Sequence, residues 1–179
     1  MCYYKEVKRN GDYMKKILLF IFMLFGIVGC SCNNDVKVTL DKGENPVKSE
    51  TSSYLYETFG LLTYELDNIS EYDSKIEAKD SFVLFIYREG CFGCQKLSPS
   101  IKDYIEDNDG AVVYSMKIET IKANHTLYKD ENISGTPWVV LVEKGSVAYK
   151  EIMPVENDTE AKAKDWFYKL MEKHVVWEE

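Results

Sequence analysis

Hydrophobic and polar positions divide the chain into three parts. Near the beginning, twelve apolar residues, Ile17–Val28, directly follow a pair of lysines. Residues 31–53 are polar and show little apolar periodicity. From residue 54 to the end, strand-like and helix-like apolar patterns follow one another, which predicts one folded domain over residues 54–179.

The pattern within residues 54–179 alternates between the two periodicities. Short apolar or alternating segments predict strands at 62–66, 82–87, 111–116, 138–142 and 147–149. Apolar residues at helical spacing predict helices at 54–59, 69–76, 120–130 and 158–176, and one more helix that follows Cys91 and buries Leu97 and Ile105. Strands that alternate with helices and end in a hairpin predict an α/β fold with three layers, in which helices cover both faces of a mixed central sheet.

The apolar run Ile17–Val28 has the length of a signal-peptide core. A membrane-spanning helix needs about 20 apolar residues, whereas a basic pair, a short apolar stretch and small residues at its end are typical of secretory leaders. We therefore interpret residues 1–29 as a signal peptide, with Met14 as the true start and residues 1–13 as a misassigned extension. An uncleaved anchor or a buried helix is the alternative.

The leader ends in Ile27-Val28-Gly29-Cys30, which resembles the lipobox of bacterial lipoproteins. The resemblance implies that Cys30 is acylated and becomes the first residue of the mature chain. The protein is then anchored to the cell membrane on its extracytoplasmic face. We expect the polar residues 30–53 to form a flexible tether with a reach of about 25–30 Å. Within it, we expect Cys32 to be a bystander thiol, with a second acylation or a mixed disulfide as the alternatives.

Composition and charge narrow the classes of function. The chain is 45% hydrophobic and 29% charged, as expected for a packed domain, and its formal net charge is −8. Removal of residues 1–29 takes away five basic and two acidic residues and lowers this charge to −11. Nucleic-acid binding normally requires a basic surface, so we expect no nucleic-acid partner.

The five cysteines are odd in number and cannot form a closed disulfide scaffold: Cys2, Cys30, Cys32, Cys91 and Cys94. Only Cys91 and Cys94 fall inside the predicted domain, with two residues between them, at the junction of a buried strand and a helix. A helix N-terminus presents free N–H groups that stabilise an anion, which lowers the pKa of a cysteine placed there. We therefore predict a catalytic pair in which Cys91 is the nucleophile and Cys94 the resolving thiol.

The surroundings of this pair resemble the thioredoxin-like family. Pro99 lies eight residues after Cys91, where the family has a proline in its active-site helix. The segment Ile133-Ser-Gly-Thr-Pro137 is similar to the loop that precedes the family's cis-proline, and Gly145 follows eight residues later. The resemblance implies a thioredoxin-like fold, a catalytic-site role for Pro137 against the cysteines, and backbone hydrogen bonds from Thr136 to a substrate chain.

Phe92 and Gly93, which separate the two cysteines, complete the predicted substrate-binding residues. The sequence also departs from the family, because Phe85 occupies the strand position of a buried aspartate that helps to deprotonate the resolving cysteine. Glu89 could substitute for this base from the rim, although an exposed loop carboxylate is the simpler interpretation. The segment 82–102 is also similar, more weakly, to bacteriocin-transport accessory proteins.

The sequence contains few residues or motifs that could bind a metal ion or a cofactor. A zinc site needs about four ligands, and the only histidines, His125 and His174, lie at no paired-ligand spacing. No phosphate-binding loop, dinucleotide motif or serine–histidine–aspartate set is present. We therefore expect no metal site and no cofactor, a packing role for His125, and a place near a helix C-terminus for His174.

These features together predict a membrane-anchored, extracytoplasmic thiol–disulfide oxidoreductase. We expect it to act as a monomer on cysteine-containing exported proteins, with a redox partner that the sequence does not identify, and to be held at the membrane by the lipid on Cys30. The alternative is a non-catalytic thioredoxin-fold lipoprotein, an accessory or binding module of an envelope or secretion complex, in which Cys91 and Cys94 form a fixed structural disulfide.

Overall fold

The computed structural model describes residues 36–44 and 53–178. The chain divides into two units, Met1–Asn34 and Asp35–Glu179, and every described residue belongs to the second unit. The expected signal peptide, the lipidated Cys30 and the bystander Cys32 lie outside the described residues.

A five-stranded mixed sheet forms the centre of the described domain, in the order β2-β4-β3-β5-β6. Its strands are Tyr64–Glu65 (β2), Phe82–Tyr87 (β3), Val113–Lys117 (β4), Trp138–Glu143 (β5) and Ser146–Ile152 (β6). β2, β4 and β3 run parallel, whereas β5 is antiparallel to β3 and β6 is antiparallel to β5. Every residue of β3 is buried, as its continuous apolar run predicts for a central strand covered on both faces.

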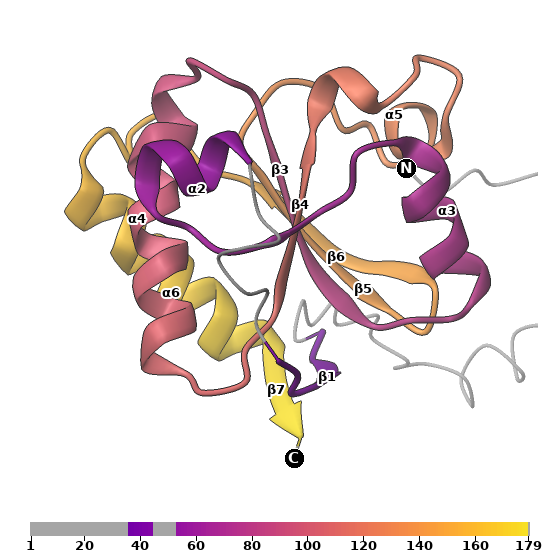
Figure 1. The fold of residues 1–179 in the computed structure, drawn as a ribbon, viewed down its shortest axis with the longest axis horizontal. Helices are drawn as coiled ribbons and strands as arrows, with labels where there is room; N and C mark the ends of the chain where they lie inside the picture. Colours follow the sequence, from indigo (N-terminus) through magenta and orange to yellow (C-terminus); the bar gives the residue numbers. More distant parts are fainter. Residues whose placement is uncertain (1–35, 45–52, 179) are drawn as a thin grey trace, which may run out of the picture. The chain divides into compact units, whose positions relative to one another are not determined.

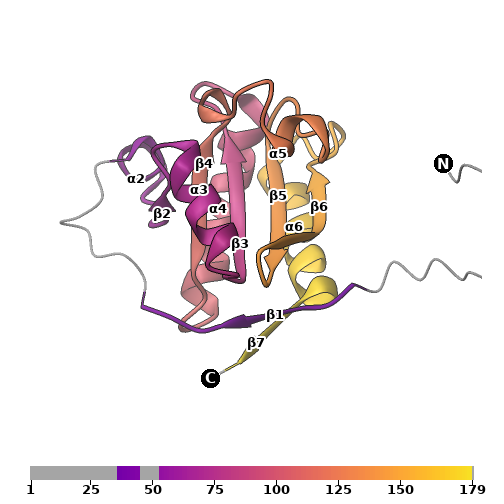
Figure 2. The same cartoon turned by 90° about the vertical axis from the view of Figure 1, so that its right-hand side faces the viewer.

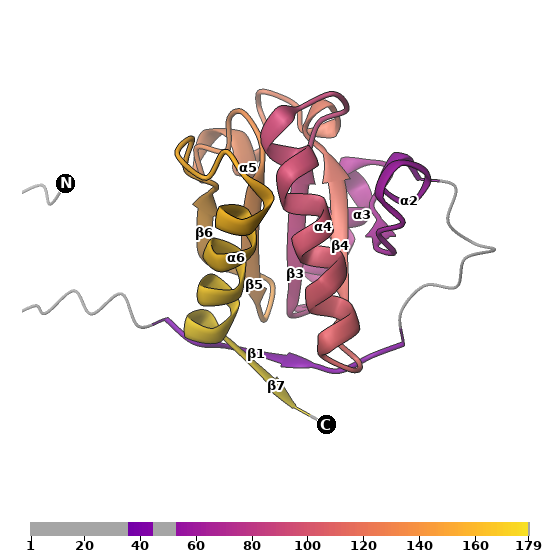
Figure 3. The same cartoon turned by 90° about the vertical axis from the view of Figure 1, so that its left-hand side faces the viewer.

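Helices cover both faces of the sheet and complete three layers (Figure 1). On one face lie α4 (Phe92–Asp107) and α6 (Glu160–His174), with α2 (Tyr54–Phe59) beside α4 (Figure 3). On the other face lie α3 (Ile69–Glu77) and α5 (Thr126–Lys129), which Figure 2 shows in front of the sheet. Alternate residues of β3 divide the core, because Phe85 and Tyr87 belong to the cluster with α4 and α6, and Leu84 and Ile86 to the opposite one. The predicted α/β fold is confirmed.

A second, two-stranded parallel sheet joins the two ends of the described chain and corrects two expectations. β1 (Val38–Asp41) pairs with β7 (Val175–Glu178) below the main sheet (Figure 2). Val38 and Leu40 are buried while Thr39 and Asp41 are exposed, so this part of the expected flexible tether is a folded strand. The last helix correspondingly ends at His174 rather than at residue 176. The prediction of a flexible tether is wrong over these four residues. The apolar alternation of β1 is too short to identify a strand from sequence, and its partner strand β7 is far away in the sequence.

His174 holds this added strand against the domain. The imidazole is 2% exposed, its Nδ1 donates to the Val36 carbonyl oxygen at 2.6 Å, and its ring stacks on Tyr149 with centroids 3.8 Å apart. The sequence places this histidine near a helix C-terminus, as observed, but gives no sign that it is buried.

One strand and one helix are shorter in the structure than the sequence predicts. The expected strand 62–66 is regular only at Tyr64–Glu65, with one more backbone bond from Leu66 N–H to Ser115. The expected helix 120–130 is a 3-10 turn at Ile118–Thr120 (η2), a loop, and then the single turn α5. His125 caps α5, since its Nδ1 accepts the Leu127 N–H, and its Nε2 lies 2.8 Å from the Asp73 carboxylate. The extended backbone of this N-cap residue separates α5 from the turn η2 before it.

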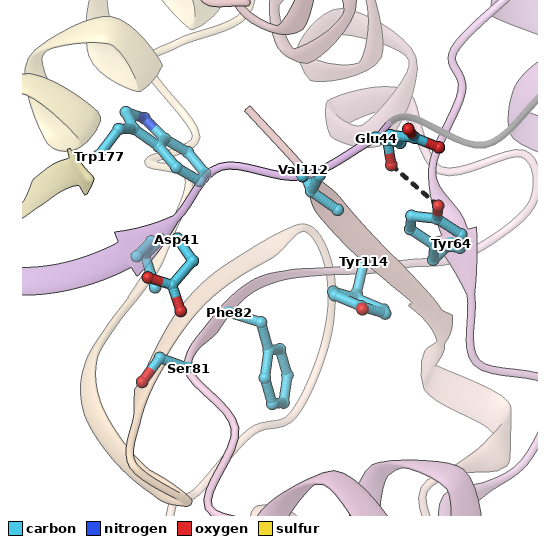
Figure 4. Close-up of a pocket in the computed structure, with 10 residues that line it drawn as sticks. Asp41, Glu44, Tyr64, Ser81, Phe82, Val112, Tyr114 and Trp177 are labelled. Atoms are coloured by element: carbon cyan, nitrogen blue, oxygen red, sulfur yellow. Dashed lines mark hydrogen bonds between the residues drawn. The ribbon is translucent and has the colours of Figure 1, made fainter. Parts of the chain in front are cut away.

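An aromatic hollow opens where the strand β1 and the residues that follow it cross the beginnings of β3 and β4. Phe82, Tyr114, Tyr64 and Trp177 line it, and the Tyr64 hydroxyl donates to the Glu44 carbonyl oxygen at 2.8 Å (Figure 4). The hollow lies at the N-terminal ends of the two parallel strands. The cysteine pair follows the C-terminal end of β3 and is therefore at the other edge of the sheet.

Candidate active site

Cys91 is the N-cap residue of α4, directly after the turn that leaves β3. Its backbone is extended, with φ −70° and ψ 120°, and its Sγ accepts the Cys94 N–H at 3.2 Å. The sulfur thus occupies the position that a serine or aspartate oxygen has in an ordinary helix cap. A cap position places an anion against free N–H groups and the positive end of the helix dipole, which is the arrangement that the sequence predicts for the nucleophile.

The two cysteines differ in exposure and are both free thiols in this structure. Cys91 is partly exposed, whereas Cys94 is 2% exposed in the core cluster beneath it. Hydrogen bonding from the Cys94 thiol lowers the pKa of Cys91 to about 5, against the opposing effect of partial burial. The same contact, together with burial, raises the pKa of Cys94 above its usual value. One thiol is therefore suited to be a thiolate at neutral pH and the other to remain protonated.

Thr136 contributes to the site through its side chain. Hydrogen bonding from this side chain acts to lower the pKa of both Cys91 and Cys94. The sequence predicts a backbone role for Thr136 toward a substrate but gives no sign of the side-chain contact. A β-branched alcohol beside a proline loop is too common a pattern for this contact to be read from sequence.

Pro137 closes over the dipeptide that separates the cysteines. The Thr136–Pro137 peptide bond is cis, and Pro137 is buried. A Cβ added to Gly93 would lie 2.9 Å from Pro137 Cδ and 3.3 Å from Met153 Cε, so a glycine is required for this close approach. Met153 also donates its N–H to the Pro137 carbonyl oxygen at 3.1 Å, and sequence reasoning missed this neighbour of the site.

Phe92 points outward from the same turn. Its side chain is 61% exposed, and Lys96 Nζ lies 5.4 Å from the ring centroid. Lys96 in turn lies 3.6 Å from the Glu160 carboxylate. The ring of Phe92 is therefore exposed at the surface beside the cysteine pair, and its substrate-binding role stays a prediction.

Ion pairs engage the charged residues that precede Cys91. Arg88 Nε lies 2.6 Å from the Glu119 carboxylate, and the Lys117 ammonium lies 2.6 Å from the Glu89 carboxylate. Glu89 is thus paired on the surface and is not directed at the cysteines as a free base. Phe85 is fully buried in the middle of β3 and brings no carboxylate to the cysteines, as the sequence predicts.

The helix that carries the pair contains the expected proline. Pro99 lies inside α4, where it has no N–H to donate to the preceding turn. Among the residues that the structure describes, no group of three or more histidine, cysteine or carboxylate side chains is arranged to hold a metal ion. In the same residues, no helix has the length and apolar character that crossing a membrane requires.

The fold and this site define a protein of the thioredoxin class: a mixed sheet, a Cys-x-x-Cys pair at the start of a helix, and a cis-proline loop beside it. The family model described as thioredoxin matches residues 64–166, more than half of the chain. The chain therefore belongs to the thioredoxin family.

Solved structures with a similar fold include several thioredoxins. Oxidized thioredoxin O1 of Arabidopsis thaliana is 16% identical, with 63% of this chain and 96% of that chain covered and a TM-score of 0.47. Oxidized mitochondrial thioredoxin 3 of Saccharomyces cerevisiae is 17% identical, with 60% and 94% covered and a TM-score of 0.44. A mutant thioredoxin of Halobacterium salinarum NRC-1 is 19% identical, with 64% and 92% covered and a TM-score of 0.44.

Proposed function

We propose that this chain is a membrane-anchored, extracytoplasmic thiol–disulfide oxidoreductase in which Cys91 is the nucleophile and Cys94 the resolving thiol. The observation that carries the proposal is the position of the Cys91 sulfur, which caps a helix and accepts the Cys94 N–H at 3.2 Å. Membership of the thioredoxin family supports the reaction type. The lipobox-like segment that ends at Cys30 supports the location.

The exchange proceeds through a mixed disulfide. The Cys91 thiolate attacks one sulfur of a partner disulfide, forms the Cys91–partner bond and releases the other partner sulfur as a thiolate. Cys94 then loses its proton to solvent or to the departing thiolate and attacks the Cys91 sulfur. The partner leaves with two thiols, and the protein retains a Cys91–Cys94 disulfide. The partner gains two electrons and the pair loses two, and the reverse sequence oxidises a partner.

The surroundings of the pair bear on the direction of this reaction. Contacts that stabilise the Cys91 thiolate stabilise the dithiol form, which makes the disulfide form a stronger oxidant. Phe85 offers no carboxylate to deprotonate Cys94, so we expect resolution to be slow. The stabilised Cys91 thiolate favours the donation of a disulfide to exported proteins over general reduction, whereas the missing carboxylate slows the Cys94 step in both directions.

Trapping of partners tests the chemistry. A full-length chain with Cys94→Ala and Cys32→Ser retains one reactive thiol in the domain, and we expect it to accumulate mixed disulfides with exported proteins on Cys91. The matched control adds Cys91→Ser, which keeps a good helix-capping oxygen and removes the nucleophile. Equal capture by both variants would count against catalysis by Cys91.

A non-catalytic binding module is the second candidate, and the buried Phe85 is the observation that favours it. Without a base for Cys94, the pair can serve as a stable structural disulfide in a docking surface. A chain with both Cys91→Ala and Cys94→Ala decides between the two. Full complementation of a deletion strain by this variant supports the binding module, and loss of complementation supports the oxidoreductase.

A further inference from the structure

The turn between β3 and the nucleophile is held by a residue from a distant part of the chain. Cys91 N–H donates to the Arg88 carbonyl oxygen at 3.3 Å, and Gly90 has a φ of 72°, which only glycine adopts without strain. The Gly90 N–H donates to the hydroxyl of Tyr54 at 3.3 Å. The residue immediately before the nucleophile therefore has a side-chain partner 36 residues away in the sequence.

Tyr54 is itself fixed in place by ring packing. Its ring is stacked parallel to Tyr87, with centroids 6.2 Å apart and planes 6° apart, and it meets Phe59 edge-on at 6.0 Å. Tyr87 stacks in turn on Phe85 at 5.8 Å and donates to the Glu65 carboxylate at 2.5 Å. Tyr54 is thus the outermost ring of a stack of three, and the other two, Tyr87 and Phe85, are buried in the core.

The short helix α2 fixes the backbone at Tyr54. Ser53 caps the helix, since its hydroxyl accepts the Tyr56 N–H at 3.2 Å, and Leu55 is fully buried. The helix ends at Gly60, whose φ of 65° allows its N–H to bond back into the last turn. α2 is therefore capped at both ends and anchored by the buried Leu55, and Tyr54 is its first residue.

From these contacts we propose that Tyr54 is a positioning residue for Cys91: its hydroxyl fixes Gly90 and thereby holds the sulfur against the first N–H groups of α4. The proposal rests on the proposed function, because it assigns Tyr54 a part in preparing the Cys91 nucleophile. Tyr54 acts only through the turn and does not contact a substrate. The direction of the Cys91 sulfur depends on the backbone angles at the cap, and these follow from the turn that Tyr54 holds.

The variant Tyr54→Phe tests the proposal because it removes the hydroxyl and keeps every ring contact. The readout is the rate of alkylation of Cys91 by iodoacetamide as a function of pH, measured on the reduced full-length chain with Cys32→Ser. We expect the midpoint of this profile to rise and the rate below the midpoint to fall about threefold, the size that the loss of one ordinary hydrogen bond implies. The matched control is Tyr128→Phe, whose side chain is 45% exposed on α5.

A merely structural role for Tyr54 predicts a different result. In that case Tyr54→Phe lowers the urea midpoint of unfolding and leaves the alkylation profile of the folded protein unchanged, which overturns the proposal. Amide hydrogen exchange on the unaltered chain gives a second measurement that needs no variant. We expect the Gly90 amide to be protected in spite of its place on a surface turn, and exchange at the rate of a free turn amide would contradict us.

The outcome is separable from that of the proposed function. Alkylation reports the state of the Cys91 sulfur without any partner protein. If trapping of partners fails while the midpoint still moves in Tyr54→Phe, the positioning role stands and the oxidoreductase does not. If partners are trapped and the midpoint does not move, the oxidoreductase stands and the role of Tyr54 is refuted.

Discussion

At the scale of single residues, the chemistry of Cys91 depends on what surrounds its sulfur. A free cysteine is mostly a thiol at neutral pH, whereas this one lies at a helix cap with the Cys94 thiol and the Thr136 side chain as hydrogen-bond partners. Predicting the pair needed only its spacing and its place after an apolar strand. Thr136 and Met153 lie near the cysteine pair but come from loops distant in the sequence. No local sequence pattern predicts that their side chains belong to the site.

The pH dependence of Cys91 follows from these contacts. The pKa of Cys91 falls to about 5 on folding, so the folded chain favours the thiolate above that value. The resulting stabilisation of the reduced protein is fully present above the ordinary pKa of a cysteine and is lost as the pH falls toward 5. We expect the thiolate absorbance at 240 nm, which Cys91→Ser removes, to titrate near pH 5. A midpoint near 8.5, the value of an unperturbed thiol, would contradict the described geometry.

Gly93 gives a prediction in which two effects oppose each other. Gly93→Ala gains helix propensity of up to about 1 kcal/mol. It also places a Cβ 2.9 Å from Pro137 Cδ, and overpacking of this kind costs about 1–3 kcal/mol. We expect the clash to prevail, with a net loss of stability in urea unfolding and slower exchange.

Phe92→Ala is the neighbouring control for Gly93→Ala. It changes a largely exposed side chain, and we expect a change in stability of less than about 0.5 kcal/mol. A stabilised Gly93→Ala variant would show that Pro137 and Met153 move aside at little cost.

At the scale of elements, long apolar runs were predicted well and short ones were not. β3 and α4 each have enough apolar positions to be predicted from sequence. The position of the cysteine pair at their junction is predicted from the same pattern. β1 has only two buried residues, and its partner strand β7 lies at the opposite end of the described chain. A four-residue alternation inside a polar region cannot be distinguished from a linker without knowledge of its partner.

Leu40 tests whether this strand is part of the fold. Leu40 is 1% exposed in the core cluster, and Leu→Ala changes at such positions cost about 2–5 kcal/mol. We expect Leu40→Ala to lower the free energy of unfolding by an amount in this range, measured by urea denaturation. Thr39→Ala, on the exposed side of the same strand, is the matched control and should change it by less than about 0.5 kcal/mol. If both variants change the free energy of unfolding by the same small amount, this segment is a flexible tether and not a strand of the fold.

At the scale of the described domain, the cysteine pair and the two-stranded sheet lie at opposite ends of the central strand β3. The cysteine pair follows the C-terminal end of β3, and the paired strands β1 and β7 lie at its N-terminal end. Because β1 begins at Val38, the proposed tether from Cys30 ends at residue 37. A chain of about eight residues reaches at most about 29 Å when fully extended.

The proposed lipid anchor gives a prediction at this scale. Removal of residues 1–29, as we propose, would leave a chain with a formal net charge of −11, which an anionic membrane repels. On this proposal, the lipid on Cys30 is what holds the chain at the membrane. We expect Cys30→Ser to abolish palmitate labelling and to remove the stable lipid attachment, while Cys32→Ser keeps both, as measured by labelling and membrane extraction. Undiminished labelling of Cys30→Ser would rule out acylation at this residue.

The sequence by itself determined the class of fold and the identity of the cysteine pair, because both depend on local periodicity and spacing. It also placed Pro137 and Phe85, although their consequences needed the structure. Only the tertiary structure decided that β1 is a strand, that the Thr136 side chain lowers the pKa of Cys91, and that the Tyr54 hydroxyl accepts the Gly90 N–H. Each of these contacts joins residues distant in the chain, and their hydrogen bonds and packing form only when the whole domain brings them together.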